Sequence, residues 1–387
     1  MIDFNNTKIA FHLKTDSELE RAYFLFKMIS NQPLVKIGTL ATNFALKTNL
    51  PVEGLIRSTV FDHFCGGISS KDCIAKIDQM FKSKVYSILD YSVEGKQNES
   101  QFEFITNKTI DLIDFAANNK SVPFSVFKPT AVGRFEIYRK VSQSEKLEDF
   151  ELEEWNKIKK RFDRIFNHAK KNNIPVLVDA EESWIQTSVD DLLLDFMKKY
   201  NKKNPIIYNT LQAYRWDRYD YLVKLHEKAK NENFIIGIKL VRGAYMEKER
   251  AHANDKGYKS PICETKLETD KNFDNCLTFM IDNLDYFYLY IGTHNEKSTL
   301  HALKLLRLKG ISNENSKIWF GQLFGMSDHI SFNLANSKYN VSKYLPFGPI
   351  RDVMPYLIRR AEENTSVAGQ TNRELELIKS EMKRRSI

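Results

Sequence analysis

The chain has 387 residues, 42% hydrophobic and 28% charged, which is ordinary globular composition and enough for one barrel domain with an appendage or for two domains. The net charge is +8, but acidic residues are interleaved with the basic ones, so no nucleic-acid-binding surface stands out. The four cysteines form no CxxC pair and have no histidine at metal-binding spacing, so we expect neither structural zinc nor a disulfide framework.

The N-terminus shows no signal-peptide or transit-peptide pattern, and no apolar run approaches the roughly 18 residues of a membrane span. We therefore expect a cytoplasmic protein, with peripheral contact with the inner membrane as the closest association. The modest positive charge would favour anionic ligands or an anionic membrane surface.

Residues 1–120 are predicted to form an N-terminal helical region. Thr15-Asp16-Ser17-Glu18 is a capping-box pattern, and apolar residues recur at helical spacing after it. Further helical patterns cover Leu34–Lys47 and Ser70–Leu89, with a break at Gly66-Gly67. This region shows no residue pattern that favours chemistry over packing.

Residues 121–387 alternate between short apolar runs and long amphipathic segments. Helical patterns occur at Leu147–Lys171, Val189–Tyr200, Tyr214–Asn231, Phe273–Asn283 and Lys297–Lys309. The apolar runs, which we expect to be strands, are Val122–Phe127, Ile174–Val178, Pro205–Tyr208, Phe234–Val241, Tyr286–Ile291, Ile318–Leu323 and Val341–Leu345. This alternation predicts an α/β fold with parallel strands, and the length suits a (β/α)8 TIM barrel. The pattern does not place an eighth strand, so an open doubly wound sheet is the alternative, although the GxGxxG fingerprint is absent.

Polar residues gather where these strands are expected to end. In a parallel barrel the carboxyl ends of the strands carry the active site. Each residue also has a simpler interpretation: Lys128 as a surface lysine, Asp179 as a helix N-cap, His294 as a structural histidine. The strand-end residues are Lys128, Asp179, Gln212, Arg242-Gly243-Ala244, Thr293-His294, Leu323 and Tyr344.

Lys239 lies within an apolar strand pattern. Alternation puts it on the same side as Gly237 and Val241, opposite Ile238. A lysine inside a buried strand needs a partner or a ligand. A structural ion pair and a role in a site both remain open.

The segment Val353–Asn364 is predicted to be a helix with two different sides. Tyr356, Arg359, Arg360 and Glu363 fall on one side at helical spacing. Two adjacent guanidiniums are well explained by an anion between them, because each matches a carboxylate or phosphate. The alternative is a solvated basic face with Glu363 as its counter-charge.

Two motifs carry a family resemblance. Lys239–Tyr245 (KLVRGAY) and Tyr344–Asn364 (YLPFGPIRDVMPYLIRRAEEN) closely resemble the FAD-dependent proline dehydrogenases of the single-function type. Val178–Glu181, Gln212–Tyr214, Thr293–Asn295 and Phe320–Met326 support it, and the likeness covers residues 120–370. It implies a distorted (β/α)8 TIM barrel with an N-terminal helical arm, and the arginine helix over the barrel mouth.

The resemblance also implies roles for individual residues. Arg359 and Arg360 would grip the carboxylate of L-proline, Glu363 would orient one of them, and Tyr356 would shape the pocket. Lys128 and Asp179 would form a charge pair beside the substrate, and Leu323 and Tyr344 would pack on its ring. Lys239 would lie near flavin N5, where many bacterial members have arginine. The positions that match FAD-binding residues are Ala180, Gln212, Arg242, Gly243, Ala244, Thr293 and His294.

The implied activity is oxidation of L-proline to Δ1-pyrroline-5-carboxylate, by hydride transfer from C5 to FAD. Electrons would pass to a membrane quinone, and a separate pyrroline-5-carboxylate dehydrogenase would act next. Hydroxyproline dehydrogenase is the nearest alternative, although Tyr344 favours proline because hydroxyproline enzymes carry a smaller residue there. Another flavin barrel and a non-catalytic binding protein are more distant alternatives.

Overall fold

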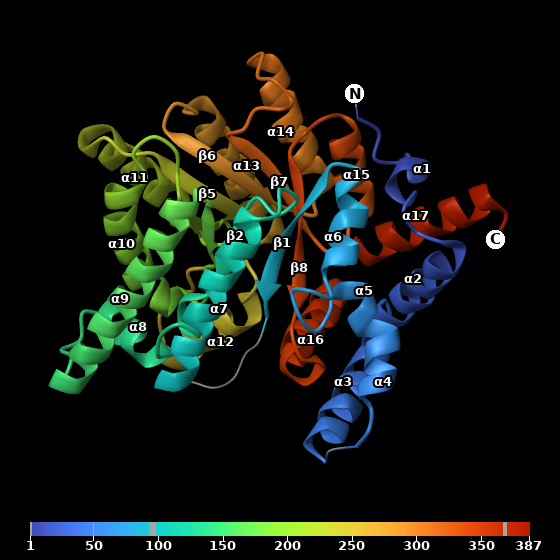
Figure 1. Cartoon of the computed structure of the whole chain (residues 1–387), viewed down its shortest axis with the longest axis horizontal. Coiled ribbons are helices and arrows are strands. Elements are labelled where there is room, and N and C mark those ends of the chain that lie inside the picture. The colour runs from blue at the N-terminus through green and yellow to red at the C-terminus, as the bar shows by residue number, and fades with distance from the viewer. Residues whose placement is uncertain (1, 49, 93–97, 367–369) are drawn as a thin grey trace. The chain divides into compact units, whose positions relative to one another are not determined.

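The computed structural model describes residues 2–48, 50–92, 98–366 and 370–387 (Figure 1). The chain forms two compact units. Unit 1 comprises Met1–Gly95 and Gly321–Ile387, and unit 2 comprises Lys96–Phe320. The predicted boundary at residue 120 lies within unit 2, between a helix and a strand, and stays a prediction.

The strands of the described part of the chain form one eight-stranded sheet in the order β1-β8-β7-β6-β5-β4-β3-β2. The strands are β1 (Val85–Tyr91), β2 (Ser125–Phe127), β3 (Val176–Val178), β4 (Ile207–Gln212), β5 (Ile236–Val241), β6 (Phe287–Gly292), β7 (Ile318–Leu323) and β8 (Val341–Phe347). Each strand pair with a described register is parallel. Helices separate most successive strands, which confirms the predicted (β/α)8 class.

The seven strands expected from the sequence are all present, with β7 at its predicted bounds. The strand that the pattern could not place is β1, and the prediction of helix through Leu89 was wrong there. The preceding helix α6 ends at Phe81, and Lys84 takes a left-handed φ of 59°. β1 then pairs with β8 from Val85↔Val341 to Tyr91↔Phe347. A short, largely apolar run fits a buried strand as well as a helix, and only the pairing decides.

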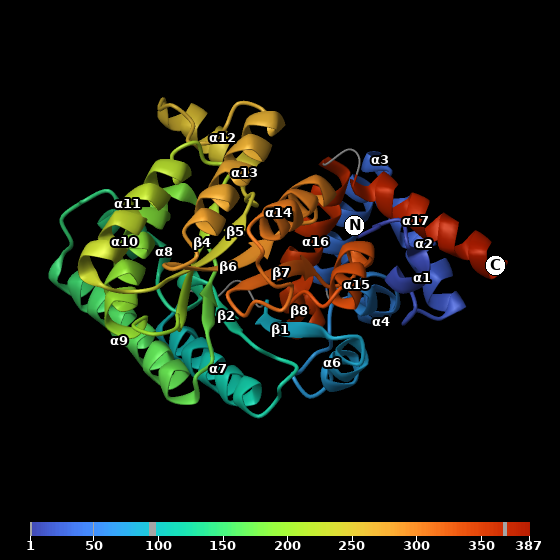
Figure 2. The ribbon, with the colours of Figure 1, turned by 90° about the horizontal axis from the view of Figure 1, so that it is seen from above.

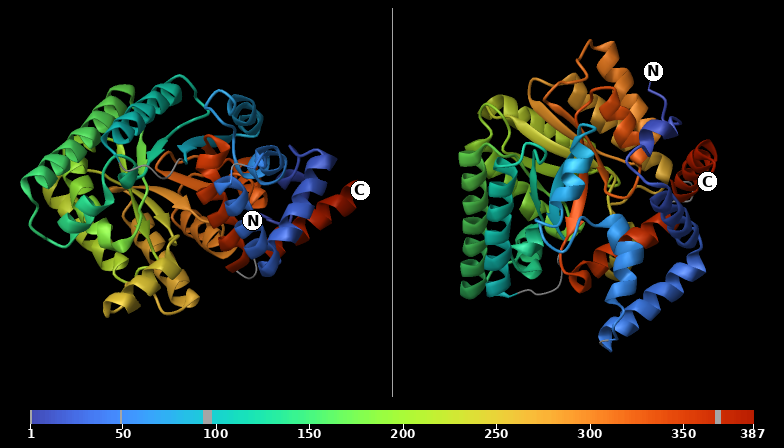
Figure 3. Two further views of the ribbon diagram at one scale, coloured as in Figure 1. Left: turned by 90° about the horizontal axis from the view of Figure 1, so that it is seen from below. Right: turned by 45° about the vertical axis from the view of Figure 1, so that its right-hand side comes forward.

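The helices of unit 2 cover the outside of its strands, as the view from above shows (Figure 2) and the green helices show from below (Figure 3, left). They are α7 (Glu99–Ala117), α8 (Phe135–Ser142), α9 (Asp149–Asn172), α10 (Ser183–Tyr200), α11 (Arg218–Glu232), α12 (Met246–Lys256), α13 (Lys266–Asp282), α14 (Glu296–Leu308) and the 3-10 turn η2 (Pro129–Ala131). α11 starts four residues later than predicted. Tyr214 belongs to a turn, where its N–H donates to the carbonyl of Arg242 at 2.6 Å.

Unit 1 carries the predicted helical arm and the C-terminal helices. The capping box of α2 is confirmed: Thr15 Oγ1 accepts from the Glu18 N–H at 3.3 Å, and Glu18 accepts from the Thr15 N–H at 2.8 Å. The helices are α1 (Thr7–Ala10), α2 (Asp16–Ile29), α3 (Gln32–Lys47), α4 (Glu53–Ile56), the π-helical turn η1 (Arg57–Phe61), α5 (Asp62–Phe64), α6 (Ile74–Phe81), α15 (Asp328–Asn336), α16 (Ile350–Ser366) and α17 (Gln370–Arg385).

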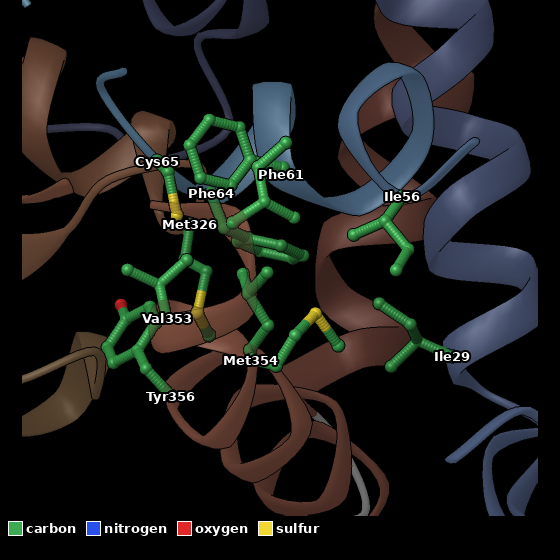
Figure 4. Close-up of a cluster of buried hydrophobic side chains, with 11 residues drawn as sticks. Ile29, Ile56, Phe61, Phe64, Cys65, Met326, Val353, Met354 and Tyr356 are labelled. Carbon is green, nitrogen blue, oxygen red and sulfur yellow. The ribbon is translucent and has the colours of Figure 1, made fainter. Parts of the chain in front are cut away.

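One apolar cluster fixes α16 within unit 1 (Figure 4). Val353, Met354 and Leu357 of α16 pack there with Phe61, Phe64 and other apolar side chains of the arm. The cluster therefore orients the helix that carries the two arginines. Tyr356, which was predicted on the same side as these arginines, is buried in this cluster.

Candidate active site

In unit 2, the strand lysine has an acidic partner. Lys239 of β5 is 6% exposed and forms an ion pair with Asp179, which follows β3. The Asp179 N–H donates to the carbonyl of Phe127 at 3.0 Å, so the turn after β3 is fixed to the end of β2. The expectation that a lysine inside a buried strand has a partner is therefore confirmed. The predicted pair of Lys128 with Asp179 stays a prediction.

Glu181 lies two residues beyond Asp179 and is a buried acid that the sequence analysis did not single out. Its carboxylate accepts from the Thr130 N–H at 3.0 Å and from the Thr130 hydroxyl at 2.7 Å, which ties the turn after Lys128 to the turn after β3. Burial raises the pKa of Glu181 to about 7, despite these hydrogen bonds. Its position after a strand was the available signal, and only the fold reveals its burial.

Gln212 extends this network to the end of β4. Its side-chain amide donates to the backbone carbonyl of Glu181 at 2.7 Å, one residue beyond Ala180. Both Gln212 and Ala180 were predicted to contact FAD, and the structure brings their backbone segments together. The network leaves the carbonyl oxygen of the Gln212 side chain for another donor.

Arg242 is held in place at the end of β5. Its guanidinium pairs with Asp270 at 2.8 Å and donates to the hydroxyls of Thr293 at 2.8 Å and Ser298 at 2.9 Å. The same group lies 4.5 Å from the centre of the Phe273 ring. Arg242 and Thr293, two predicted cofactor residues, are thus in direct contact, and the half-buried His294 follows Thr293.

The next residues form an exposed stretch of backbone. Gly243 and Ala244 are exposed, and Gly243 has a φ of 132°, which L side chains rarely adopt. A Cβ atom on Gly243 would lie 2.5 Å from the Tyr214 ring. The Tyr214 hydroxyl is itself buried and has no hydrogen-bond partner in the described part of the chain. A guanidinium, accessible backbone amides and a free side-chain carbonyl suit the phosphates and polar ring edges of a dinucleotide such as FAD.

In unit 1, the two arginines of α16 are half-buried rather than fully solvated. The Arg360 guanidinium lies 5.4 Å from the centre of the Tyr356 ring, one helical turn earlier. Tyr356 is buried in the apolar cluster of Figure 4. Partial burial weakens the solvated-face interpretation, because a buried guanidinium requires compensation. The side chain of Glu363 lies outside the described residues.

Leu323 is the last residue of β7, whereas Tyr344 lies in the middle of the neighbouring β8, which runs three residues further than Tyr344 and does not end there as the sequence suggested. The N–H of Phe324 donates to the carbonyl of Tyr344 at 2.8 Å, and Tyr344 is 8% exposed. Unit 1 therefore brings together these two residues, both predicted to pack on the substrate ring.

In the described part of the chain, no group of three or more histidine, cysteine or acidic side chains is placed to hold a metal ion. Among the same residues, none of the helices has the length and apolar character needed to cross a membrane.

The fold defines a (β/α)8-barrel protein with polar groups gathered at the ends of several strands. The family model described as proline dehydrogenase matches residues 73–373, and the chain belongs to this family. The family resemblance found in the sequence is thereby confirmed.

Three curated relatives match over most of their own length. A carbapenem antibiotics biosynthesis protein, CarD, of Pectobacterium carotovorum is 33% identical, covering 87% of this chain and 87% of the relative. Proline dehydrogenase 1 of Arabidopsis thaliana is 30% identical over 100% of this chain and 87% of the relative. A hydroxyproline dehydrogenase of Xenopus laevis is also 30% identical, over 97% and 88%. Overall sequence identity therefore does not decide whether the substrate is proline or hydroxyproline.

Among solved structures, proline utilization A of Bdellovibrio bacteriovorus matches with a TM-score of 0.71 at 19% identity, covering 93% of this chain. The chain spans 38% of that longer protein. This likeness supports the barrel fold and nothing finer.

Proposed function

We propose that the protein oxidises L-proline to Δ1-pyrroline-5-carboxylate with FAD as its cofactor. The observation that carries the proposal is the half-buried arginine pair of α16 in a chain of the proline dehydrogenase family. Two guanidiniums side by side match a single carboxylate, which is the one full negative charge of proline.

The proposed role of Arg359 and Arg360 is to bind and orient this carboxylate. Fixing a small substrate by two bidentate contacts turns a chance encounter into a defined approach. Leu323 and Tyr344 would pack on the pyrrolidine ring, and Tyr356 would support Arg360 through the ring contact at 5.4 Å.

In unit 2, Arg242, Gly243, Ala244, Gln212, Ala180, Thr293 and His294 would hold FAD. When bound, FAD accepts the hydride that leaves C5 of proline. Lys239 would supply positive charge where negative charge develops, and Asp179 would keep that ammonium in place. Lys128 would be a further charged residue beside the substrate, together with Asp179.

The same proposal extends to the electron acceptor and to the next reaction. Electrons would pass to a membrane quinone, reached through peripheral contact with the bilayer. The product would go to a separate pyrroline-5-carboxylate dehydrogenase.

Oxidation rates with L-proline and with trans-4-hydroxy-L-proline, measured with a dye as electron acceptor, test the substrate. We expect proline to be strongly preferred, because Tyr344 leaves little room at C4 of the ring. A Tyr344→Ser variant should shift the preference toward hydroxyproline. A wild-type preference for hydroxyproline would instead assign the alternative activity.

A further inference from the structure

Unit 1 contains a cavity of about 370 Å³ that takes no part in the proposed reaction. This volume is at the lower end of the range for small-molecule sites, and would hold on the order of ten water molecules. α2, α5, α6, the turn after β7, α15 and β8 contribute to its wall. Its polar lining includes Lys14, His63, Lys76, Asp328 and Lys343.

The buried charges of this cavity do not balance. Lys343 is 1% exposed and pairs with Asp328 at 2.7 Å, while Lys14 approaches the other carboxylate oxygen of Asp328 at 3.4 Å. One carboxylate therefore serves two ammonium groups. Lys343 also donates to the carbonyl of Met326 at 2.7 Å, which does not neutralise charge.

Lys76 adds a third ammonium group to the same wall. It donates to the carbonyls of Cys65 at 2.7 Å and Asp62 at 3.0 Å, and lies 5.3 Å from the centre of the Phe324 ring. No carboxylate in the described part of the chain lies within ion-pair distance of Lys76. Burial lowers its pKa, although the charge of the nearby Asp62 opposes this shift.

The other titratable groups of the wall do not compensate this excess. The Asp62 side chain is 50% exposed, and the Glu18 carboxylate caps α2 at the Thr15 N–H. His63 donates from Nε2 to the carbonyl of Gly325 at 2.9 Å, and burial together with Lys14 lowers its pKa to about 3. His63 is therefore neutral and presents Nδ1 as an acceptor. Arg21 is exposed and adds a further positive charge to the lining.

We infer that this cavity binds a small organic carboxylate, with its charged group at Lys76 and Arg21. An anion would supply the missing negative charge and accept charge-assisted hydrogen bonds. The wall also carries apolar side chains beside the polar Ser58, Thr59 and Gln79, and these apolar groups suit a hydrocarbon body rather than a fully hydrated inorganic ion. The apolar side chains are Leu13, Leu25, Met80, Phe324 and Phe332. The site is a new one, and this assignment is independent of the proposed function.

Two residues that line the cavity are also direct sequence neighbours of two predicted substrate residues. Lys343 precedes Tyr344 on β8, and Phe324 follows Leu323 at the end of β7. The Phe324–Tyr344 hydrogen bond links the two segments. If the proposed function holds, a bound carboxylate would change the KM for proline through these neighbours.

Butanoate is a suitable probe, observed by saturation-transfer NMR of its methyl protons. A background with both Arg359→Met and Arg360→Met removes the two proposed proline arginines, so that binding there does not contribute. We expect saturable butanoate binding that weakens about tenfold with Lys76→Met. Arg21→Gln, at an exposed position that should not affect folding, should weaken it about threefold. Lys309→Met, which removes an exposed lysine paired with Asp282 in unit 2, should leave it unchanged.

Three results with butanoate or its amide would overturn the assignment, and a fourth concerns phosphate. The first three are the absence of saturable butanoate binding, equal binding of the uncharged butanamide, and unchanged affinity in both the Lys76 and Arg21 variants. Binding of inorganic phosphate in place of butanoate would also reject an organic carboxylate. None of these readouts needs proline oxidation, so this inference and the proposed function fail separately.

Discussion

Each unit contains a buried strand lysine that pairs with an aspartate, but the two pairs have different surroundings. In unit 2, Lys239 pairs with Asp179, whose side chain is 17% exposed. In unit 1, Lys343 pairs with Asp328, which also serves Lys14, and Lys343 donates to a backbone carbonyl besides. The sequence analysis singled out Lys239 and passed over Lys343.

The difference shows that a strand lysine does not by itself indicate a catalytic site. Asp328 is enclosed, and Lys343 and Lys14 hold its pKa well below its usual range despite burial. Asp179 follows the end of β3 and directly precedes Ala180, one of the residues that are proposed to hold FAD. We therefore assign the Lys343–Asp328 pair to stability, and we propose that the Lys239–Asp179 pair acts in the reaction.

The largest expected effect is on the free energy of unfolding, which should respond differently to the loss of each ion pair. Asp328→Asn should lower the free energy of unfolding by about 3–5 kcal/mol, because it leaves Lys343 buried without a counter-charge. Asp179→Asn should cost about half as much and instead lower turnover on proline. Urea unfolding and kcat per folded enzyme measure both quantities. A smaller loss of stability for Asp328→Asn than for Asp179→Asn would reverse the assignment.

The arginines of α16 extend the comparison to substrate binding. Arg359→Met or Arg360→Met should raise the KM for proline about a hundredfold, equivalent to about 3 kcal/mol, while FAD stays bound. Arg351→Met is the matched control on the same helix, since Arg351 pairs with Glu53 at 2.5 Å on the surface. A wild-type KM in both test variants would reject the carboxylate clamp.

Glu181 is a third buried acid, and its hydrogen bonds come from Thr130 rather than from a lysine. Its pKa is raised from 4.5 to about 7, so the folded protein retains a proton that the unfolded chain loses over this range. Stability should therefore fall as pH rises from about 5 to about 7, by up to about 3 kcal/mol. Glu181→Gln should remove this fall and exceed wild type in stability above pH 7.

Urea midpoints for wild type and Glu181→Gln at about pH 5 and about pH 8 check this sign. Glu232→Gln serves as the control, because the side chain of Glu232 is 42% exposed and pairs with Lys198. Identical pH dependence in wild type and Glu181→Gln would show that Glu181 does not titrate in this range.

The smallest effect concerns two glycines with positive φ. Gly243→Ala should cost about 2–3 kcal/mol and weaken FAD retention, because the new Cβ would meet the Tyr214 ring at 2.5 Å. Gly257→Ala, where nothing lies within 4 Å, should cost about 1 kcal/mol and leave FAD bound. Melting temperatures and flavin content after dialysis measure both. Equal flavin content would remove Gly243 from the proposed cofactor site.

The local sequence pattern was sufficient to predict most strands and helices of the barrel, but it did not predict the networks of buried charged residues. Alternation located Lys239 on β5, and helical spacing located the arginines on α16, because both are periodic signals. β1 was missed because its short apolar run fits the periodicity of a helix as well as that of a strand. Glu181, Lys76 and Asp328 acquire their surroundings from segments far away in sequence, and no local pattern records such contacts.

The most direct test of proline oxidation by bound FAD is the absorbance spectrum of the purified protein, recorded before and after anaerobic addition of L-proline. We expect a flavin spectrum that bleaches with proline and much less with trans-4-hydroxy-L-proline. A flavin spectrum that proline leaves unchanged would contradict the proposed substrate, and a protein that takes up no FAD on reconstitution would contradict the proposed cofactor.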